Sequence, residues 1–151
     1  MSEPPPLARL LAIAYRSLID GLHDALRQRG WTDVRPAYGF VLLAARDHAT
    51  TAGELAALMG VTKQATSKLV DAMVASGYVL RSAGVGDARR RPIELTARGR
   101  ELLATVESIY AELEAGWADI VGRDHVERLR ADLVAVVTAP DGTLPAVRPT
   151  W

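Results

Sequence analysis

The chain has 151 residues, 49% of them hydrophobic, and its 18 Lys and Arg balance 18 Asp and Glu to give no net charge. This length supports one compact core, so we expect a single domain over residues 1–151. The absence of cysteine excludes disulfides, Cys-based zinc sites and thiol redox sensing, and no segment reads as an export signal or a membrane span, so we expect a cytoplasmic protein.

The first predicted element is a long amphipathic helix from Leu7 to Arg29. Apolar residues recur along it at three- and four-residue spacing, prolines precede it and Gly30 follows it. Pro36 is expected to open a second helix, which should pack beneath the elements that follow it. The residues that should make this contact are Val41, Leu42, Leu43 and Ala45.

The pattern Thr51-Ala52-Gly53-Glu54 predicts the start of a third helix. The Thr51 hydroxyl can cap the helix, and the Glu54 side chain can accept a bond from the Thr51 amide. Gly60 provides a left-handed stop, and Thr62 can cap the next helix after a tight turn. The third helix should bury an apolar side made of Leu55, Ala56, Leu58 and Met59.

The helix that follows Thr62 has two different faces. Its apolar residues share one face at helical spacing and should be buried: Ala65, Leu69, Val70, Met73 and Val74. The opposite face must then carry the polar residues Lys63, Gln64, Ser67, Lys68 and Asp71. An outward face that can hydrogen-bond indicates a DNA-reading helix, with Thr62, Lys63, Gln64, Ser67 and Lys68 as candidate contacts.

A β-hairpin is predicted after this helix. Tyr78–Arg81 and Arg91–Leu95 read as strands around a turn-rich segment. Because Pro92 cannot donate a ladder bond, its strand is expected at the edge of the sheet. The hairpin carries the candidate DNA contacts Arg89, Arg90 and Arg91.

Two more helices and an irregular tail complete the chain. Thr96 should cap a long helix that runs to about Val121, with an apolar stripe. A last helix is expected to begin at Asp124, with Glu127 at capping-box spacing. It should turn inward the residues Val126, Leu129, Leu133, Val136 and Val137. The tail, residues 140–151, has three prolines and no period, and we expect no regular structure there.

Several short motifs together resemble the winged helix-turn-helix core of MarR-type transcriptional regulators. They are Thr51-x-x-Glu54-Leu55-Ala56, Gly60-Val61-Thr62, Gly86-Asp87-x-Arg89 and Leu95-Thr96-x-x-Gly99. The resemblance implies a mainly α fold with a small β-hairpin wing, in which a winged helix-turn-helix at 34–96 is flanked by dimerisation helices at 7–30 and 97–139. It also implies that Arg89 enters the minor groove and that Asp87 orients it.

The charge distribution favours a nucleic-acid partner despite the neutral total. Residues 62–101 carry eight Lys and Arg against four Asp and Glu, a net +4, and the rest of the chain carries −4. An ordinary solvated helix would also carry lysines, so this alternative stays open. The terminal helices are longer and more apolar than a small winged helix needs, which indicates a second copy of the chain as partner.

Enzymatic and metal-binding interpretations find little support. His23, His48 and His125 are scattered without ligand spacing, and no phosphate loop or nucleophile elbow occurs. We therefore expect no enzyme, no cofactor and no metal. Asp47-His48 and Asp124-His125 raise a metal hypothesis through zinc-sensing members of the resembled family, but the long fifth helix offers no histidine.

The resemblance also implies a cleft for aromatic or phenolic anions between the dimer helices and the winged unit. Candidate ligand contacts are Arg16, His23, Trp31 and Tyr38; the alternative is that Trp31 and Tyr38 are ordinary packing residues and that Arg16 is a solvated charge. We therefore expect a homodimeric, sequence-specific DNA-binding regulator that acts on a pseudo-palindromic operator, as a repressor relieved by a small aromatic or anionic ligand. The alternative is a winged-helix protein-interaction module without specific DNA binding.

Overall fold

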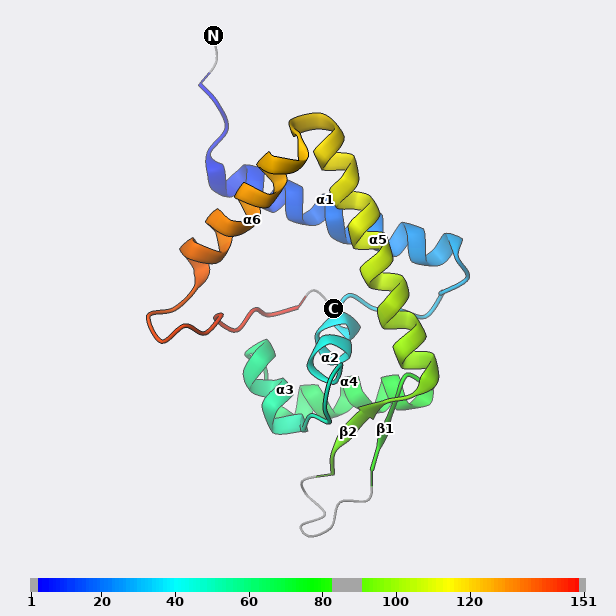
Figure 1. Cartoon of the computed structure of the whole chain (residues 1–151). Coiled ribbons are helices and arrows are strands. Elements are labelled where there is room, and N and C mark those ends of the chain that lie inside the picture. The colour runs from blue at the N-terminus through cyan, green and yellow to red at the C-terminus, as the bar shows by residue number, and fades with distance from the viewer. Residues whose placement is uncertain (1–2, 83–90, 150–151) are drawn as a thin grey trace.

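The computed structural model describes residues 3–82 and 91–149. In these residues the elements are α1 (Leu7–Gln28), α2 (Tyr38–Ala44), α3 (Ala52–Met59), α4 (Lys63–Ala75), β1 (Val79–Arg81), β2 (Ile93–Leu95), α5 (Ala97–Val121) and α6 (Arg123–Val137). The predicted mainly α fold with a two-stranded hairpin is confirmed. Figure 1 shows α3, α4 and the hairpin at one end of the molecule, with α6 and the far end of α5 at the other.

The predicted helix caps of the central elements form as expected. Thr51 Oγ1 accepts a bond from Glu54 N at 3.1 Å, and Glu54 Oε2 accepts one from Thr51 N at 3.2 Å. Gly60 ends α3 in the left-handed conformation with φ 61°, and Thr62 Oγ1 then accepts from Ala65 N at the start of α4. These bonds span only three residues each, so the local sequence determines where α3 and α4 begin.

The hairpin is joined to α3 through a single backbone pair. β1 and β2 are antiparallel with Arg81 opposite Ile93. On its other side Ile93 exchanges two backbone bonds with Thr50, of 3.0 and 2.7 Å. In this two-stranded sheet β2 is an edge strand, as expected, and one isolated bridge joins it to Thr50 because the Ile93 amide and carbonyl point away from β1. Pro92 precedes β2 and accepts a bond from Ser82 N at 2.8 Å, but without an amide hydrogen it cannot return the second bond of this pair.

The start of α5 lies directly against the base of the hairpin. Thr96 N donates to Tyr78 O at 3.0 Å, and Thr96 Oγ1 caps α5 by accepting from Gly99 N at 3.0 Å. A Cβ atom at Gly99 would lie only 2.0 Å from Tyr78 O. Glycine is therefore required at this position for steric reasons, because backbone meets backbone without room for a side chain.

The core lies where the second half of α1, α2, α3, α4, the hairpin and the first half of α5 meet. Its largest fully buried members are Tyr38, Tyr78, Leu26, Leu42, Leu55, Met59, Leu69, Met73, Ile93, Leu102 and Ile109. Three residues expected to be buried, Leu43, Leu58 and Val74, are exposed instead. Helical spacing placed them beside true core positions, but no other element covers them.

The last helix differs from its prediction at both its start and its buried face. It begins at Arg123 after Gly122, whose φ is 97°, and no side chain caps it, so the expected Asp124–Glu127 cap is wrong. Of the five residues expected to face inward only Val126 is buried within this chain. The tail contains no helix or strand from residue 138 to 149, as expected. None of the helices in the described ranges is long and apolar enough to cross a bilayer.

Candidate nucleic-acid interface

The outward face of α4 carries most of the candidate DNA contacts. Thr62, Lys63, Gln64 and Lys68 are exposed, and Ser67 is half-buried. The opposite face holds Thr66, Leu69, Val70 and Met73 in the core. Because three- and four-residue steps return to the same side of a helix, these two sets cannot exchange places. The polar groups of α4 are therefore presented together to solvent from a capped helix start.

Thr66 is a buried polar residue that the sequence analysis did not single out. It is fully buried, and its Oγ1 donates to Thr62 O at 3.0 Å. This bond to the preceding turn satisfies the hydroxyl without a distant partner. Thr66 therefore belongs to the packed face of α4, and the threonine at this spacing could have been recognised as such.

Of the candidate DNA contacts on the hairpin, one, Arg91, lies within the residues that the structure describes. Arg91 is exposed just before β2, and its Nη2 donates to Arg81 O at 3.5 Å. Asp87, Arg89 and Arg90 lie outside the described residues. The exposed guanidinium of Arg91 thus lies on the same unit as the outward face of α4.

A second arginine of the hairpin, Arg81, was counted in the charge of this segment but not singled out as a site residue. Its Nη1 lies 2.7 Å from Asp71 Oδ1, on α4. The contact joins residues ten positions apart in different elements. Helical periodicity places Asp71 on the outward face but cannot show that the last residue of β1 reaches it.

An aromatic cluster, formed by Trp31, Tyr38 and Tyr78, joins α1 to the winged half of the molecule. The rings of Trp31 and Tyr38 lie 6.1 and 6.0 Å from that of Tyr78. The Arg98 guanidinium lies 5.0 Å from the Trp31 ring and 5.2 Å from the Tyr78 ring. Tyr78 also donates its hydroxyl to Asp33. Cation–π and aromatic contacts of this kind hold the connection between α1 and α2 against the base of α5.

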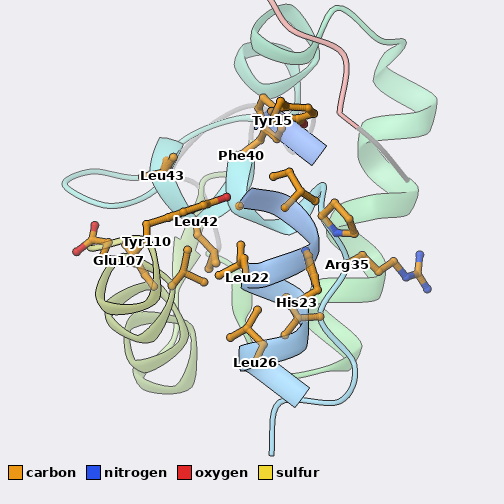
Figure 2. Close-up of a pocket in the computed structure, with 16 residues that line it drawn as sticks. Tyr15, Leu22, His23, Leu26, Arg35, Phe40, Leu42, Leu43, Glu107 and Tyr110 are labelled. Carbon is orange, nitrogen blue, oxygen red and sulfur yellow. The ribbon is translucent and has the colours of Figure 1, made fainter. Parts of the chain in front are cut away.

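A cavity of about 240 Å³ lies between α1, α2 and α5. Its lining is mainly apolar and aromatic and includes Tyr15, Ile19, Leu22, His23, Leu26, Val34, Arg35, Pro36, Phe40, Leu42, Leu43, Leu103, Val106, Glu107 and Tyr110. Figure 2 shows the charged ends of Arg35 and Glu107 pointing outward on opposite sides. Glu107 forms an ion pair with Arg46. The cavity therefore combines an apolar interior with a cationic group, Arg35, at its rim.

Burial changes the titration of two groups that line this cavity. Burial lowers the pKa of His23 below its ordinary value of 6.5, and the nearby Arg27 guanidinium adds to the shift. The imidazole is therefore neutral at pH 7 and can donate or accept a hydrogen bond. Burial raises the pKa of Tyr110, with a smaller contribution from Tyr15. The hydroxyl of Tyr110 is thus a neutral donor.

Only part of the predicted ligand set lines the cavity. His23 does, whereas Arg16 lines a neighbouring, more open depression that His23 and Arg35 also line. Arg16 Nε lies 3.2 Å from Asp20 Oδ1, one helical turn away. Trp31 and Tyr38 belong to the aromatic cluster instead, because each packs on Tyr78. Arg35, Phe40, Tyr15 and Tyr110 were missed, since their convergence depends on how three helices meet.

No metal-binding group was found in the part of the chain that the structure describes. There, no three His, Asp or Glu side chains gather closely enough to hold a metal ion. His48 and His125, which raised the metal hypothesis, are both exposed. The hypothesis thus gains no ligand set from the fold.

Comparison with protein families gives one match, to the MarR family over residues 32–90. This range includes α2, α3, α4 and β1 and ends within the hairpin. Comparison with curated proteins gives no match.

Solved MarR-family structures have the same fold over most of the chain. MarR of Escherichia coli in its apo form is 24% identical, with a TM-score of 0.70, over 89% of this chain and 99% of that chain. The Mycobacterium tuberculosis MarR-family protein Rv2887, in complex with salicylic acid, is 24% identical, with a TM-score of 0.66 over 90% and 99%. MepR, a transcription regulator of the Staphylococcus aureus multidrug efflux pump MepA, is 20% identical, with a TM-score of 0.68 over 87% and 96%. At these identities the matches show the fold.

Proposed function

We propose that this chain, which matches the MarR family over residues 32–90, is a homodimeric, sequence-specific DNA-binding transcriptional regulator. In this proposal the whole chain is one domain, with a winged helix-turn-helix at 34–96 and dimerisation helices at 7–30 and 97–139. The protein acts in the cytoplasm as a repressor that a small aromatic or anionic ligand releases. No catalytic role is part of the proposal.

The observation that carries the proposal is the outward face of α4 beside a basic hairpin. Gln64 and Lys68 are exposed one helical turn apart, and the capped start of α4 projects with them. The segment 62–101 holds a net +4 within a neutral chain. A major groove admits one helix, where Gln pairs well with adenine and Lys donates to guanine. Positive charge next to such a helix binds phosphates.

Exposed apolar residues on the outer helices support a dimer. α1 leaves Leu7, Leu10, Leu11, Ile13 and Tyr15 exposed, and α6 leaves Leu129, Leu133, Val134, Val136 and Val137 exposed. Monomeric proteins rarely expose apolar side chains in such numbers on neighbouring turns. A second copy would bury both stripes and place two α4 helices about one DNA turn, roughly 34 Å, apart.

The cavity between α1, α2 and α5 supports a ligand of limited size. Tyr15, Phe40 and Tyr110 provide aromatic surface, and Arg35 at the rim provides a cation for a carboxylate. The cavity lies between a proposed dimerisation helix and the winged unit. A ligand shifts a binding equilibrium only through its different affinity for the two conformations. Occupancy that favours an α1–α2 spacing unsuited to DNA would release the operator.

Selection of DNA by the full-length protein tests the central claim. Genomic fragments retained by the protein should share a pseudo-palindromic sequence. Gln64→Ala or Lys68→Ala should lose about 1 to 3 kcal/mol of discrimination at the base each contacts. Arg128→Ala, which removes an exposed cation on α6, is the matched control and should change neither affinity nor base preference. Retention of random fragments, with Gln64 and Lys68 replaceable, would favour a protein-interaction module instead.

The wing and the phosphate contacts are tested with the same DNA. Arg89→Ala should weaken binding strongly, because an arginine in a narrow minor groove reads its width and potential. Loss of Arg90 or Arg91 should reduce the slope of log affinity against log salt concentration (the salt slope) by about 1 without altering sequence preference. Unchanged affinity in Arg89→Ala would remove the wing from the proposed interface.

The dimer is tested with a charge placed in the exposed stripe of α6. Leu133→Asp would bury an unpaired carboxylate in the interface, which should cost several kcal/mol of dimer stability. Light scattering at micromolar concentration should show a dimer for the wild type and a monomer for the variant. Asp132→Asn, which changes a neighbouring exposed position, should leave the mass unchanged. A folded wild-type monomer at this concentration would rule out the proposed assembly.

Ligand release is tested with salicylate and a panel of aromatic carboxylates. Each is titrated into the complex of the protein with its selected DNA. Release should be weakened by Arg35→Gln, which removes the cation at the rim. It should not be weakened by Arg16→Gln, which removes a nearby cation outside the cavity. No release by any member of the panel would separate the DNA-binding function from ligand control.

A further inference from the structure

Arg81 connects the hairpin to the middle of α4. It is the last residue of β1, and its Nη1 lies 2.7 Å from Asp71 Oδ1 while its Nη2 donates to Ser67 O at 3.4 Å. One planar guanidinium thus reaches two successive turns of α4. A planar fork of fixed donors holds such partners in one geometry better than a flexible lysine would.

The two side chains of this pair differ in exposure, the arginine being the more buried of the two. The Arg81 side chain is 25% exposed, whereas that of Asp71 is 66% exposed. The arginine is therefore largely enclosed between β1 and α4, and the carboxylate lies at the surface. Asp71 occupies the outward side of α4, three residues beyond Lys68. A carboxylate so placed repels phosphate unless a cation neutralises it.

We propose that Arg81 is a positioning residue, which fixes the angle between the hairpin and α4 and makes no DNA contact itself. The proposal rests on the proposed DNA-binding function and names how its two parts are held in register. Ser67 and Lys68 are candidate base contacts on the turn that Arg81 reaches, so the same bond that orients the hairpin also orients this turn of α4. Asp71 anchors the arginine, which is why an acid is tolerated on a DNA-facing helix.

Arg91 is the natural comparison within the same hairpin. It is exposed, and the contact found for it is a long one, from its Nη2 to Arg81 O at 3.5 Å. It has the same charge as Arg81 and lies just before the neighbouring strand, β2. Arg91→Gln therefore removes one positive charge from the hairpin without removing its connection to α4.

The decisive variant is Asp71→Asn, for which charge and positioning give opposite expectations. Removing an acid from a DNA-facing helix should strengthen binding if only charge matters. If Asp71 anchors Arg81, the ratio of operator affinity to random-DNA affinity should fall by about tenfold, a coupling typical of contacting charged residues. Arg81→Gln should lower the same ratio, and the double variant should lower it no further than either single one. Arg81→Lys should lower this ratio less than Arg81→Gln does, but should not keep it at the wild-type value.

These affinities are measured for the full chain against its selected DNA and against random DNA at several salt concentrations. Arg91→Gln should weaken both affinities alike and reduce the salt slope by about 1. The proposal is overturned if Arg81→Gln behaves as Arg91→Gln does while Asp71→Asn strengthens binding to both DNAs, since Arg81 would then be a phosphate contact.

A measurement on the free protein separates this inference from the proposed function. Amide hydrogen exchange should quicken in β1 and in the middle of α4 for Arg81→Gln and for Asp71→Asn, but not for Arg91→Gln. If the wild type retains no DNA, the proposed function fails, and faster exchange in these two variants alone would still show that Arg81 holds the hairpin to α4. Equal exchange in all three variants would show that it does not.

Discussion

The winged half of the molecule buries its apolar side chains, whereas the outer helices leave many of theirs exposed. Leu42, Leu55 and Met73 are completely buried among α2, α3, α4 and the hairpin. In the outer helices Ile120 is 82% exposed and Val136 81% exposed. Both regions have apolar residues at helical spacing, so periodicity alone does not distinguish them. The difference is that apolar residues of the winged half pack against other elements of the same chain, whereas those of the outer helices are left exposed and in the proposed dimer would pack against a second copy.

The largest effects should separate these two regions by truncating one leucine in each. Leu42→Ala should lower the free energy of unfolding by about 2 to 5 kcal/mol, because it leaves a cavity in a closed core. Leu133→Ala, at a residue 36% exposed in this chain, should act mainly through association. Thermal unfolding over a hundredfold range of protein concentration checks this. The deficit of Leu42→Ala should be constant, whereas that of Leu133→Ala should be largest at high concentration and shrink on dilution, where neither protein gains stability from association.

A second pair of variants makes the same substitution at two places in α5. A Cβ at Gly99 would lie 2.0 Å from Tyr78 O, whereas at Gly116 it would meet nothing within 4 Å. Gly99→Ala should therefore cost about 3 kcal/mol, the upper end for overpacking, because backbone must move. Gly116→Ala should instead add about 0.5 to 1 kcal/mol through helix propensity. Denaturant unfolding of both variants gives the two values, and a mild Gly99→Ala would contradict the close approach.

Tyr78→Phe should have a smaller effect, located at the joint between the regions. It removes the hydroxyl that donates to Asp33 and should cost about 1.5 kcal/mol at pH 7. The Tyr78 hydroxyl, more than any other group, holds the pKa of Asp33 below its usual 3.8. The contribution of this hydrogen bond to the free energy of unfolding is therefore fully present above pH 3.8 and is lost as pH falls through the lowered pKa. The difference between wild type and variant should therefore shrink in strong acid. A difference that stays constant with pH would mean that Asp33 is not the partner.

The smallest effect should come from the titration of His23. Its pKa is lowered by burial, so the unfolded chain takes up a proton near pH 6.5 before the folded chain does. The free energy of unfolding should therefore decrease slightly as pH falls below 6.5, down to the folded pKa, and then change no further through this group. His23→Gln should lack this slope. An NMR titration of His23 with a midpoint at or above 6.5 would contradict the assignment.

The sequence predicts local features well because they depend on neighbouring residues. The caps by Thr51, Thr62 and Thr96 each involve a bond to the residue three positions later, and all three form. Fold class follows from the same local signals together with helical periodicity. The Asp124–Glu127 spacing failed because Gly122 already turns the chain and α6 begins one residue earlier.

Features that depend on which elements meet were harder to predict. Trp31 and Tyr38 were candidate ligand contacts with ordinary packing as the alternative, because aromatic residues serve both roles, and their contacts with the Tyr78 ring could not be read from the sequence. The pair of Arg81 with Asp71 joins a strand to a helix, and neither residue marks the other in the sequence. The cavity residues come from three helices, so no single pattern in the chain marks them.

The 25 residues of α5 also have a mechanical consequence. At 1.5 Å per residue the helix is about 37 Å long, and its first turn is seated on the base of the hairpin through Thr96 and Gly99. Because the helix is attached to the hairpin at its first turn, a rotation of the whole helix moves the hairpin with it. A tilt of about 5° at the far end would move the hairpin by about 3 Å over this length. That displacement is comparable to the length of a hydrogen bond, so in the proposed dimer small rotations between the two subunits would decide whether the proposed groove contacts are made.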